Sequence, residues 1–134
     1  MDEHMDLTPL KECKKSHLVL NLRGIQRINS IGIKKWVETL RTLVAEGRTI
    51  TYEECSEVIV ETCNISLAFV MGVQVTSFEL TLGCTHCDYY ETKLFQREEV
   101  EPNLVPPATP CPHCGKPMAL EEEDLLEFLD EVGA

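Results

Sequence analysis

Two Cys-x-x-Cys pairs in the C-terminal half constrain this chain more than any other feature. Cys84 and Cys87 form the first pair, and Cys111 and Cys114 form the second. Two such knuckles, each at the tip of a short hairpin, place four thiolates at the corners of a tetrahedron, the geometry that Zn²⁺ adopts with sulfur. Gly115 follows the second pair, where a tight turn favours a residue that tolerates positive φ. The spacing predicts a zinc ribbon with one structural Zn²⁺ per chain, because four protein ligands leave no coordination position for water.

The alternative interpretation of the second pair is a thiol–disulfide oxidoreductase that uses Cys111 and Cys114. Redox pairs of this kind stand at the start of a helix. Here Gly115, Lys116 and Pro117 follow at once, and proline is poorly accommodated in a helix interior. A redox role also leaves the first cysteine pair without a purpose, so the sequence favours zinc.

The charge of the chain narrows the range of partners. The 134 residues carry a formal net charge of −11 and only 6% aromatic residues. A nucleic-acid-binding surface needs clustered basic residues that displace counterions from phosphates, and the sequence has no such cluster. We therefore expect no direct nucleic-acid contact and instead a protein partner with a basic surface.

The remaining cysteines and the N-terminal residues indicate the cellular compartment of the protein. Cys13, Cys55 and Cys63 lack metal-ligand spacing, and the odd total of seven cysteines suits a reducing environment. The first residues lack the basic start and apolar stretch of a signal peptide, and no apolar run reaches membrane-spanning length. The expected location is the cytoplasm.

The order of elements in the first half is typical of an α/β fold. Residues 17–22 form an apolar run of strand length, and a helix with apolar residues at three-four spacing extends from Ser30 to a C-terminal cap at Gly47. Residues 49–52 are β-branched and aromatic, as in a second strand. The order strand, helix, strand predicts a right-handed crossover between parallel strands.

A second helix and a long strand follow. Ser56 is a plausible N-cap. Four residues are expected to face inward: Val58, Ile59, Thr62 and Cys63. Residues 73–82 alternate like one strand that continues into the first knuckle.

Three segments are predicted. Residues 1–78 form the α/β domain, and 79–119 form the zinc ribbon, with a proline-rich connector at 102–112. Residues 120–134 are strongly acidic with an apolar helical face formed by Leu125, Leu126, Leu129 and Val132. This terminal helix either docks on the protein's own sheet or binds a partner.

The turn before the first helix is a second candidate site. Asn29, Ser30 and Gly32 lie where free backbone N–H groups and the helix dipole would stabilise a phosphate. The plainer interpretation is an N-cap, which contributes about 1 kcal/mol to stability.

Residues 18–25 and 28–33, which include this turn, resemble the core of STAS domains, the anti-sigma-factor antagonist fold. The family pattern is an apolar strand, a turn reading Asp-Ser-Ser/Thr-Gly and a helix, and the resemblance extends over roughly residues 7–78. The cysteine pairs after this core resemble a bacterial subgroup with an appended ribbon.

The resemblance implies a non-catalytic signalling regulator that acts by protein–protein binding. In the antagonist branch a kinase phosphorylates a hydroxyl of the turn, which would be Ser30 here. Asn29 replaces the acidic residue of that pattern and Ile31 the second hydroxyl residue. The family's first strand should precede residue 17, where few residues are available, so we expect a small STAS-like sheet that lacks this strand. Its open edge would invite pairing with a partner or with a second copy as a homodimer.

Overall fold

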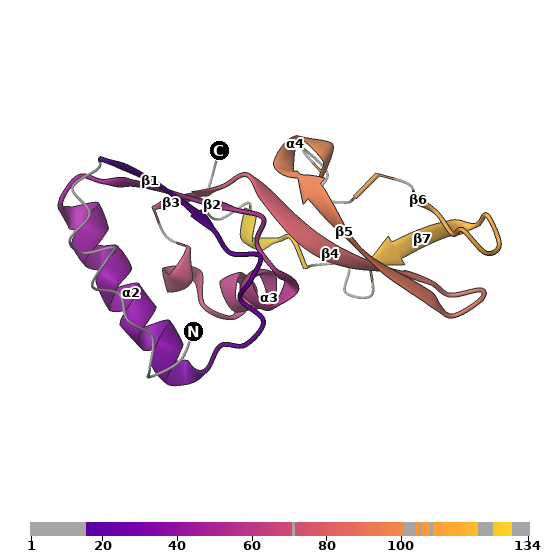
Figure 1. The fold of residues 1–134 in the computed structure, drawn as a ribbon, viewed down its shortest axis with the longest axis horizontal. Helices are drawn as coiled ribbons and strands as arrows, with labels where there is room; N and C mark the ends of the chain where they lie inside the picture. The colour runs from indigo at the N-terminus through magenta and orange to yellow at the C-terminus, as the bar shows by residue number, and fades with distance from the viewer. Residues whose placement is uncertain are drawn as a thin grey trace.

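The structure is a computed structural model that describes residues 16–70, 72–100, 104, 106, 107, 109–120 and 125–129 (Figure 1). It is a mixed α/β structure with one parallel and one antiparallel sheet. In chain order the elements are β1 (His17–Asn21), α2 (Ser30–Ala45), β2 (Thr49–Glu53), α3 (Glu57–Ile65), the 3₁₀ turn η1 (Leu67–Phe69), β3 (Val73–Val75), β4 (Ser77–Cys84), β5 (Tyr89–Gln96), α4 (Arg97–Val100), β6 (Thr109–Pro110) and β7 (Pro117–Leu120).

The parallel sheet has the strand order β1-β2-β3, which confirms the predicted strand, helix, strand arrangement. Leu18 of β1, Ile50 of β2 and Val73 of β3 are register partners, and all three are buried. Their neighbours in β1 and β3, Val19 and Gln74, point to the opposite face and are exposed. Residues 1–15 lie outside the described part of the chain, and with them the prediction that a first strand is missing.

Helix α2 begins and ends where the sequence predicts. Asn29 is the N-cap, and Gly47 after the last turn has a φ of 81°. Gly47 donates its N–H to the Val44 carbonyl, and Arg48 donates to that of Leu43. This is the Schellman arrangement, which satisfies the carbonyls at the end of a helix and requires a left-handed residue.

An aromatic cluster joins α2 to the sheet. Trp36 of α2 donates its indole N–H to the Tyr52 hydroxyl at 2.6 Å, and that hydroxyl donates to the Phe69 carbonyl at 2.6 Å. All three rings are buried, with centroids 5.8–6.4 Å apart. Polar atoms inside the core therefore have partners, which removes the cost of burying them.

The second helix begins after the predicted N-cap residue but differs from the prediction in its buried face. Ser56 is the N-cap residue of α3, but its hydroxyl donates to the Ile25 carbonyl instead of capping the helix. Val58 is half-buried and Val60 is fully buried, so the inward face is rotated by part of a turn. Ile59, Thr62 and Cys63 are buried as predicted. The bond to Ile25 ties the start of α3 to the loop after β1.

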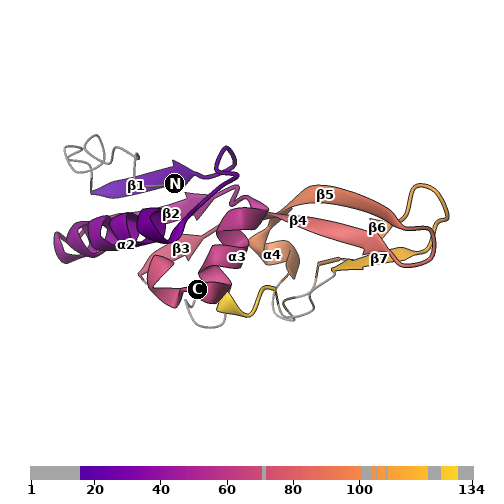
Figure 2. The same cartoon turned by 90° about the horizontal axis from the view of Figure 1, so that it is seen from below.

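The predicted single strand at residues 73–82 is wrong in one respect, because it is broken at Thr76. The Thr76 N–H donates to the Tyr52 carbonyl at 3.0 Å, which is the last hydrogen bond of the ladder between β2 and β3. After the break one isolated parallel bridge, between Cys55 and Phe78, follows. From Ser77 the chain turns into β4, which pairs antiparallel with β5. The segment joins the two sheets, as Figures 1 and 2 show. The predicted domain boundary at residue 78 falls inside β4.

The antiparallel sheet has the order β5-β4-β7-β6 and contains both knuckles. Strand β5 was not anticipated from the sequence. Thr109 and Pro110, assigned to the connector, form the edge strand β6 and pair with Met118 and Pro117. An edge position tolerates proline because the missing N–H is not needed there.

Part of the C-terminal segment is described and lies against the core. Leu126, Phe128 and Leu129 are buried, and the Leu129 carbonyl accepts from the Arg97 guanidinium at 3.4 Å. Leu120 belongs to β7 and not to a helix. The rest of the predicted helix, residues 121–124 and 130–134, lies outside the described residues. Within the described residues no helix combines the length and apolar character needed to cross a membrane.

Candidate metal centre

The four cysteines of the two knuckles come together at the far end of the antiparallel sheet. Their sulfur atoms all lie within 4.8 Å of one another and could hold a metal ion. The Sγ atoms of Cys84 and Cys114 are 3.4 Å apart, and those of Cys87 and Cys111 are 3.3 Å apart. Sulfurs around tetrahedral Zn²⁺ would be about 3.8 Å apart, given the usual Zn–S distance of about 2.3 Å. The donor set and its spacing fit a tetrathiolate metal site.

The two knuckles have the same backbone geometry. In the first, Asp88 donates its N–H to the Cys84 carbonyl at 2.9 Å. In the second, Gly115 donates to the Cys111 carbonyl at 2.8 Å. Asp88 and Gly115 follow the second cysteine of their pairs and have positive φ of 56° and 75°. The prediction for Gly115 is confirmed, and aspartate is among the residues that tolerate this conformation best.

The hydrogen bonds of the first knuckle favour a thiolate. Burial raises the pKa of Cys84, but hydrogen bonds from the Cys87 and His86 N–H groups and from the Cys114 side chain outweigh it and lower the pKa to about 6. The sulfur contact with Cys111 raises the pKa of Cys87 to about 12. The Lys116 N–H lowers the pKa of Cys114, but desolvation and the Cys84 and Cys111 sulfurs raise it overall. A divalent ion would deprotonate all four ligands, so binding would release protons.

Polar and aromatic side chains surround the sulfurs. The Tyr89 ring packs edge-on against His113 with centroids 4.6 Å apart. The Lys116 ammonium lies 3.4 Å from Nδ1 of His86. Cys84 and Cys111 are buried, whereas Cys87 and Cys114 are exposed at the tip. The site is therefore half embedded in the ribbon and half open to solvent.

The other described cysteines have no part in this centre. Cys55 and Cys63 are buried in the α/β core. Desolvation raises the pKa of Cys55 well above its usual value and that of Cys63 to about 12. Thiols of this kind are poor nucleophiles and behave as small apolar residues. Cys13 lies outside the described residues.

The turn at Asn29, Ser30 and Gly32 lies in the other part of the molecule, at the start of α2 (Figure 2). Oδ1 of Asn29 accepts the Gly32 N–H at 2.8 Å, so Asn29 is the helix cap. Ser30 is the first residue of α2 and is exposed. The turn and the cysteine cluster are thus separate sites.

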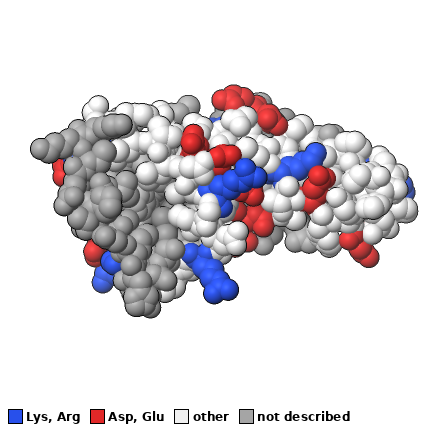
Figure 3. Space-filling model, in the orientation of Figure 1, with Lys and Arg blue, Asp and Glu red and all other residues white. Residues whose placement is uncertain are grey.

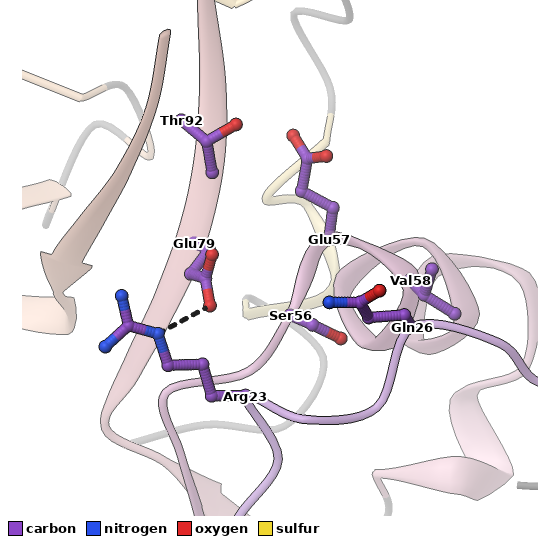
Figure 4. A pocket seen from close by; sticks show the side chains of 7 residues that line it. All are labelled: Arg23, Gln26, Ser56, Glu57, Val58, Glu79 and Thr92. Atoms are coloured by element: carbon purple, nitrogen blue, oxygen red, sulfur yellow. Dashed lines mark ion pairs between the residues drawn. The ribbon is translucent and has the colours of Figure 1, made fainter.

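Sequence reasoning missed a polar pocket of about 430 Å³ between the loop after β1, the start of α3 and the antiparallel sheet (Figure 4). Nε of Arg23 lies 3.4 Å from a Glu79 oxygen there, and Nη1 lies 3.6 Å from a Glu54 oxygen. These residues are far apart in sequence, and no motif links them. The segment Tyr89–Gln96, which forms one wall, has no alternation of polar and apolar residues, and only its aromatic residues and threonine favour a strand.

Comparison with known proteins adds no relative: neither a protein-family model, nor a curated protein, nor a solved structure matches the chain.

Proposed function

We propose that the chain is a non-catalytic, STAS-like regulatory module, stabilised by structural Zn²⁺, that acts by binding protein partners. The observation that carries this proposal is the cluster of four cysteine sulfurs, which all lie within 4.8 Å of one another. Four sulfur ligands fill the coordination sphere of Zn²⁺, and a closed site of this kind contributes folding energy instead of hydrolysis. The parallel sheet with its crossover helices is compatible with the STAS resemblance.

The thiol oxidoreductase is less well supported by the geometry. Cys111 is buried, and a turn and strand β7 follow it where a redox pair would begin a helix. The close sulfur contacts join the two knuckles, Cys84 to Cys114 and Cys87 to Cys111. Such cross-pairing suits one shared ion better than a disulfide within one Cys-x-x-Cys pair.

Two further properties remain proposals. The exposed position of Ser30 leaves its hydroxyl accessible to a kinase, as a phospho-switched antagonist would need. Among the described residues β1 pairs only with β2, so its outer edge could pair with a second copy. Phosphorylation in a cell extract and the dimer mass in solution test these two properties separately.

Native mass spectrometry before and after chelation, combined with an insulin-reduction assay, tests the proposal. We expect one Zn²⁺ per chain, reduced thiols and no disulfide-reductase activity. Cys84→Ser and Cys111→Ser should lose the zinc, whereas Cys63→Ala should keep it because that thiol lies in the α/β core. A metal-free chain that reduces insulin through Cys111 and Cys114 would replace this proposal with the redox function.

A further inference from the structure

One face of the β4–β5 hairpin has two hollows along it. Alternate residues of β4, namely Glu79, Thr81 and Gly83, share this face with their partners Leu94, Thr92 and Tyr90 of β5. Glu79 and Thr92 line the pocket of about 430 Å³, whereas Gly83 and Tyr90 line a second of about 370 Å³ beside the first knuckle. Both hollows therefore open along the same strand face.

The first hollow has an excess of negative charge. Glu57 and Glu79 line it, and Glu54 lies beside it, against one guanidinium, that of Arg23 (Figure 4). The Glu79 side chain is 19% exposed and that of Glu54 is 27% exposed, so both carboxylates are partly shielded from water. Partial shielding strengthens their attraction for a cation.

The acidic wall is held in place by its own hydrogen bonds. Glu54 has a φ of 48°, an unfavourable conformation for glutamate, and its N–H donates to the Ser77 hydroxyl at 2.7 Å. Its carboxylate accepts from the Asn21 amide, and the Glu57 carboxylate accepts from the Thr81 hydroxyl. Strained residues kept by their surroundings are concentrated at binding sites.

The second hollow is lined mainly by apolar atoms, although Cys84 and Thr85 also line it. The Tyr90 ring lies over Gly83, where an added Cβ would be 2.9 Å from the ring. Ala119 and Leu120 of β7 form its other side. Tyr90 is 54% exposed, and Leu94 on the same strand face is 38% exposed. Exposed aromatic and aliphatic side chains beside a small residue suit an apolar side chain of a partner.

From this charge and shape we propose that the β4–β5 face binds an extended, basic segment of a partner protein. This inference rests on the proposed protein-binding function and specifies its site. An arginine or lysine of the segment enters the acidic hollow, and an apolar side chain about four residues away enters the hollow beside Tyr90. Four residues of extended chain span about 13 Å, the length of β4 from Glu79 to Gly83. The net charge of −11 would also steer a basic segment toward the molecule, although Figure 3 shows basic side chains interspersed with acidic ones on one face.

Titration of the zinc-loaded, ¹⁵N-labelled chain with synthetic peptides tests this surface. The probe is an extended peptide with one arginine and, four positions on, one leucine; a second peptide has glutamate in place of arginine. We expect the first to shift the amide signals of Glu57, Glu79, Thr92 and Tyr90, with weaker binding as salt increases. The glutamate peptide should leave these amide signals unshifted.

Two matched variants distinguish binding at the acidic hollow from attraction by the overall negative charge of the protein. Glu79→Gln should weaken the arginine peptide about two- to fivefold, the range of a partly exposed ion pair. Glu38→Gln removes an equal charge from the exposed face of α2 and should leave binding unchanged. Equal weakening by the two variants, or shifts confined to the start of α2, would overturn the inference. Shifts of the same amides with protein concentration alone would assign the surface to a second copy and also overturn it.

Measuring zinc content together with peptide binding shows whether this inference or the proposed function has failed. A zinc-loaded chain that ignores the arginine peptide refutes the β4–β5 site and leaves the structural zinc intact. A chain without zinc that still binds the peptide through Glu79 refutes the structural-zinc proposal and supports the surface.

Discussion

At the scale of single residues, the Tyr52 hydroxyl is notable because it makes hydrogen bonds to two buried groups. It accepts from the Trp36 indole and donates to the Phe69 carbonyl, each at 2.6 Å. Burial raises the pKa of Tyr52 well above its usual value, so the hydroxyl stays protonated and able to donate. A single oxygen atom thus satisfies polar groups from α2 and η1.

Removal of this oxygen should destabilise the α/β core. Tyr52→Phe keeps the ring but leaves a buried donor and a buried acceptor without a partner, which costs about 1–3 kcal/mol for each group. We expect a loss of about 2–4 kcal/mol in the free energy of unfolding, measured by urea denaturation. Tyr89→Phe is the control, because the Tyr89 side chain is only half-buried and its hydroxyl can bond to water. Equal losses in the two variants would contradict the role assigned to Tyr52.

At the scale of elements, the two knuckles reach one geometry with different residues. Gly115 has a φ of 75° and Asp88 has a φ of 56°. The left-handed conformation costs a residue with a Cβ roughly 1–2 kcal/mol, and aspartate offsets part of this through local hydrogen bonding. Glycine avoids the cost but has more conformational freedom to lose on folding.

Substitution at these two positions should therefore have unequal effects. Gly115→Ala should lower the free energy of unfolding by about 1–2 kcal/mol, because alanine cannot offset the strain of the left-handed conformation. Asp88→Gly should change it by less than about 0.5 kcal/mol, since relief of strain and added unfolded-state entropy oppose each other. Thermal denaturation monitored by circular dichroism measures both. Gly24→Ala is the control, because a Cβ there meets open space and φ lies outside the positive region. If Gly115→Ala is as stable as Gly24→Ala, the turn adopts a conformation that alanine tolerates, and the predicted strain is absent.

The elements also show how much the sequence could predict. The ends of α2 follow from Asn29 and Gly47, and the cysteine cluster follows from spacing, because both are local patterns. The break at Thr76 coincides with the left-handed backbone of Glu54 on the neighbouring segment, whose N–H donates to the Ser77 hydroxyl. Strand β6 is defined by its pairing with β7. The Arg23–Glu79 contact likewise depends on two sheets meeting. These features arise from long-range pairing, which periodicity within one segment does not reveal.

At the scale of the whole molecule, strand β4 belongs to both halves. Its first residues are tied to the α/β part, because Cys55 donates to the Ser77 carbonyl at 3.0 Å and Glu79 donates to that of Cys55 at 2.7 Å. Near its end, Leu82 and Gly83 lie between β5 and β7 and lead into the candidate metal centre at Cys84. One continuous set of buried side chains extends from the parallel sheet to Cys84 and Cys111.

This arrangement predicts a graded response to loss of the proposed zinc. Removal of the ion takes away the link that holds the two knuckles together, so β7 should separate from the end of β4. Hydrogen exchange should then show lost protection at the Gly83 amide, which lies on the β7 side of β4, whereas the Glu79 amide, bonded to Cys55, should keep most of its protection. Far-UV circular dichroism should retain the signal of α2 and α3.

The control for this experiment is the same chelator added to Cys111→Ser, in which the Gly83 amide should be unprotected from the outset and show no further change. Uniform loss of protection along β4 would mean that the two sheets unfold as one cooperative unit, in keeping with their shared core. Retained protection at Gly83 without metal would mean that pairing with β5 and β7 alone holds the strand, and the zinc would then have no structural role there. The position along β4 at which protection returns thus locates the boundary between the zinc-dependent ribbon and the self-sufficient α/β part, which the sequence placed at residue 78.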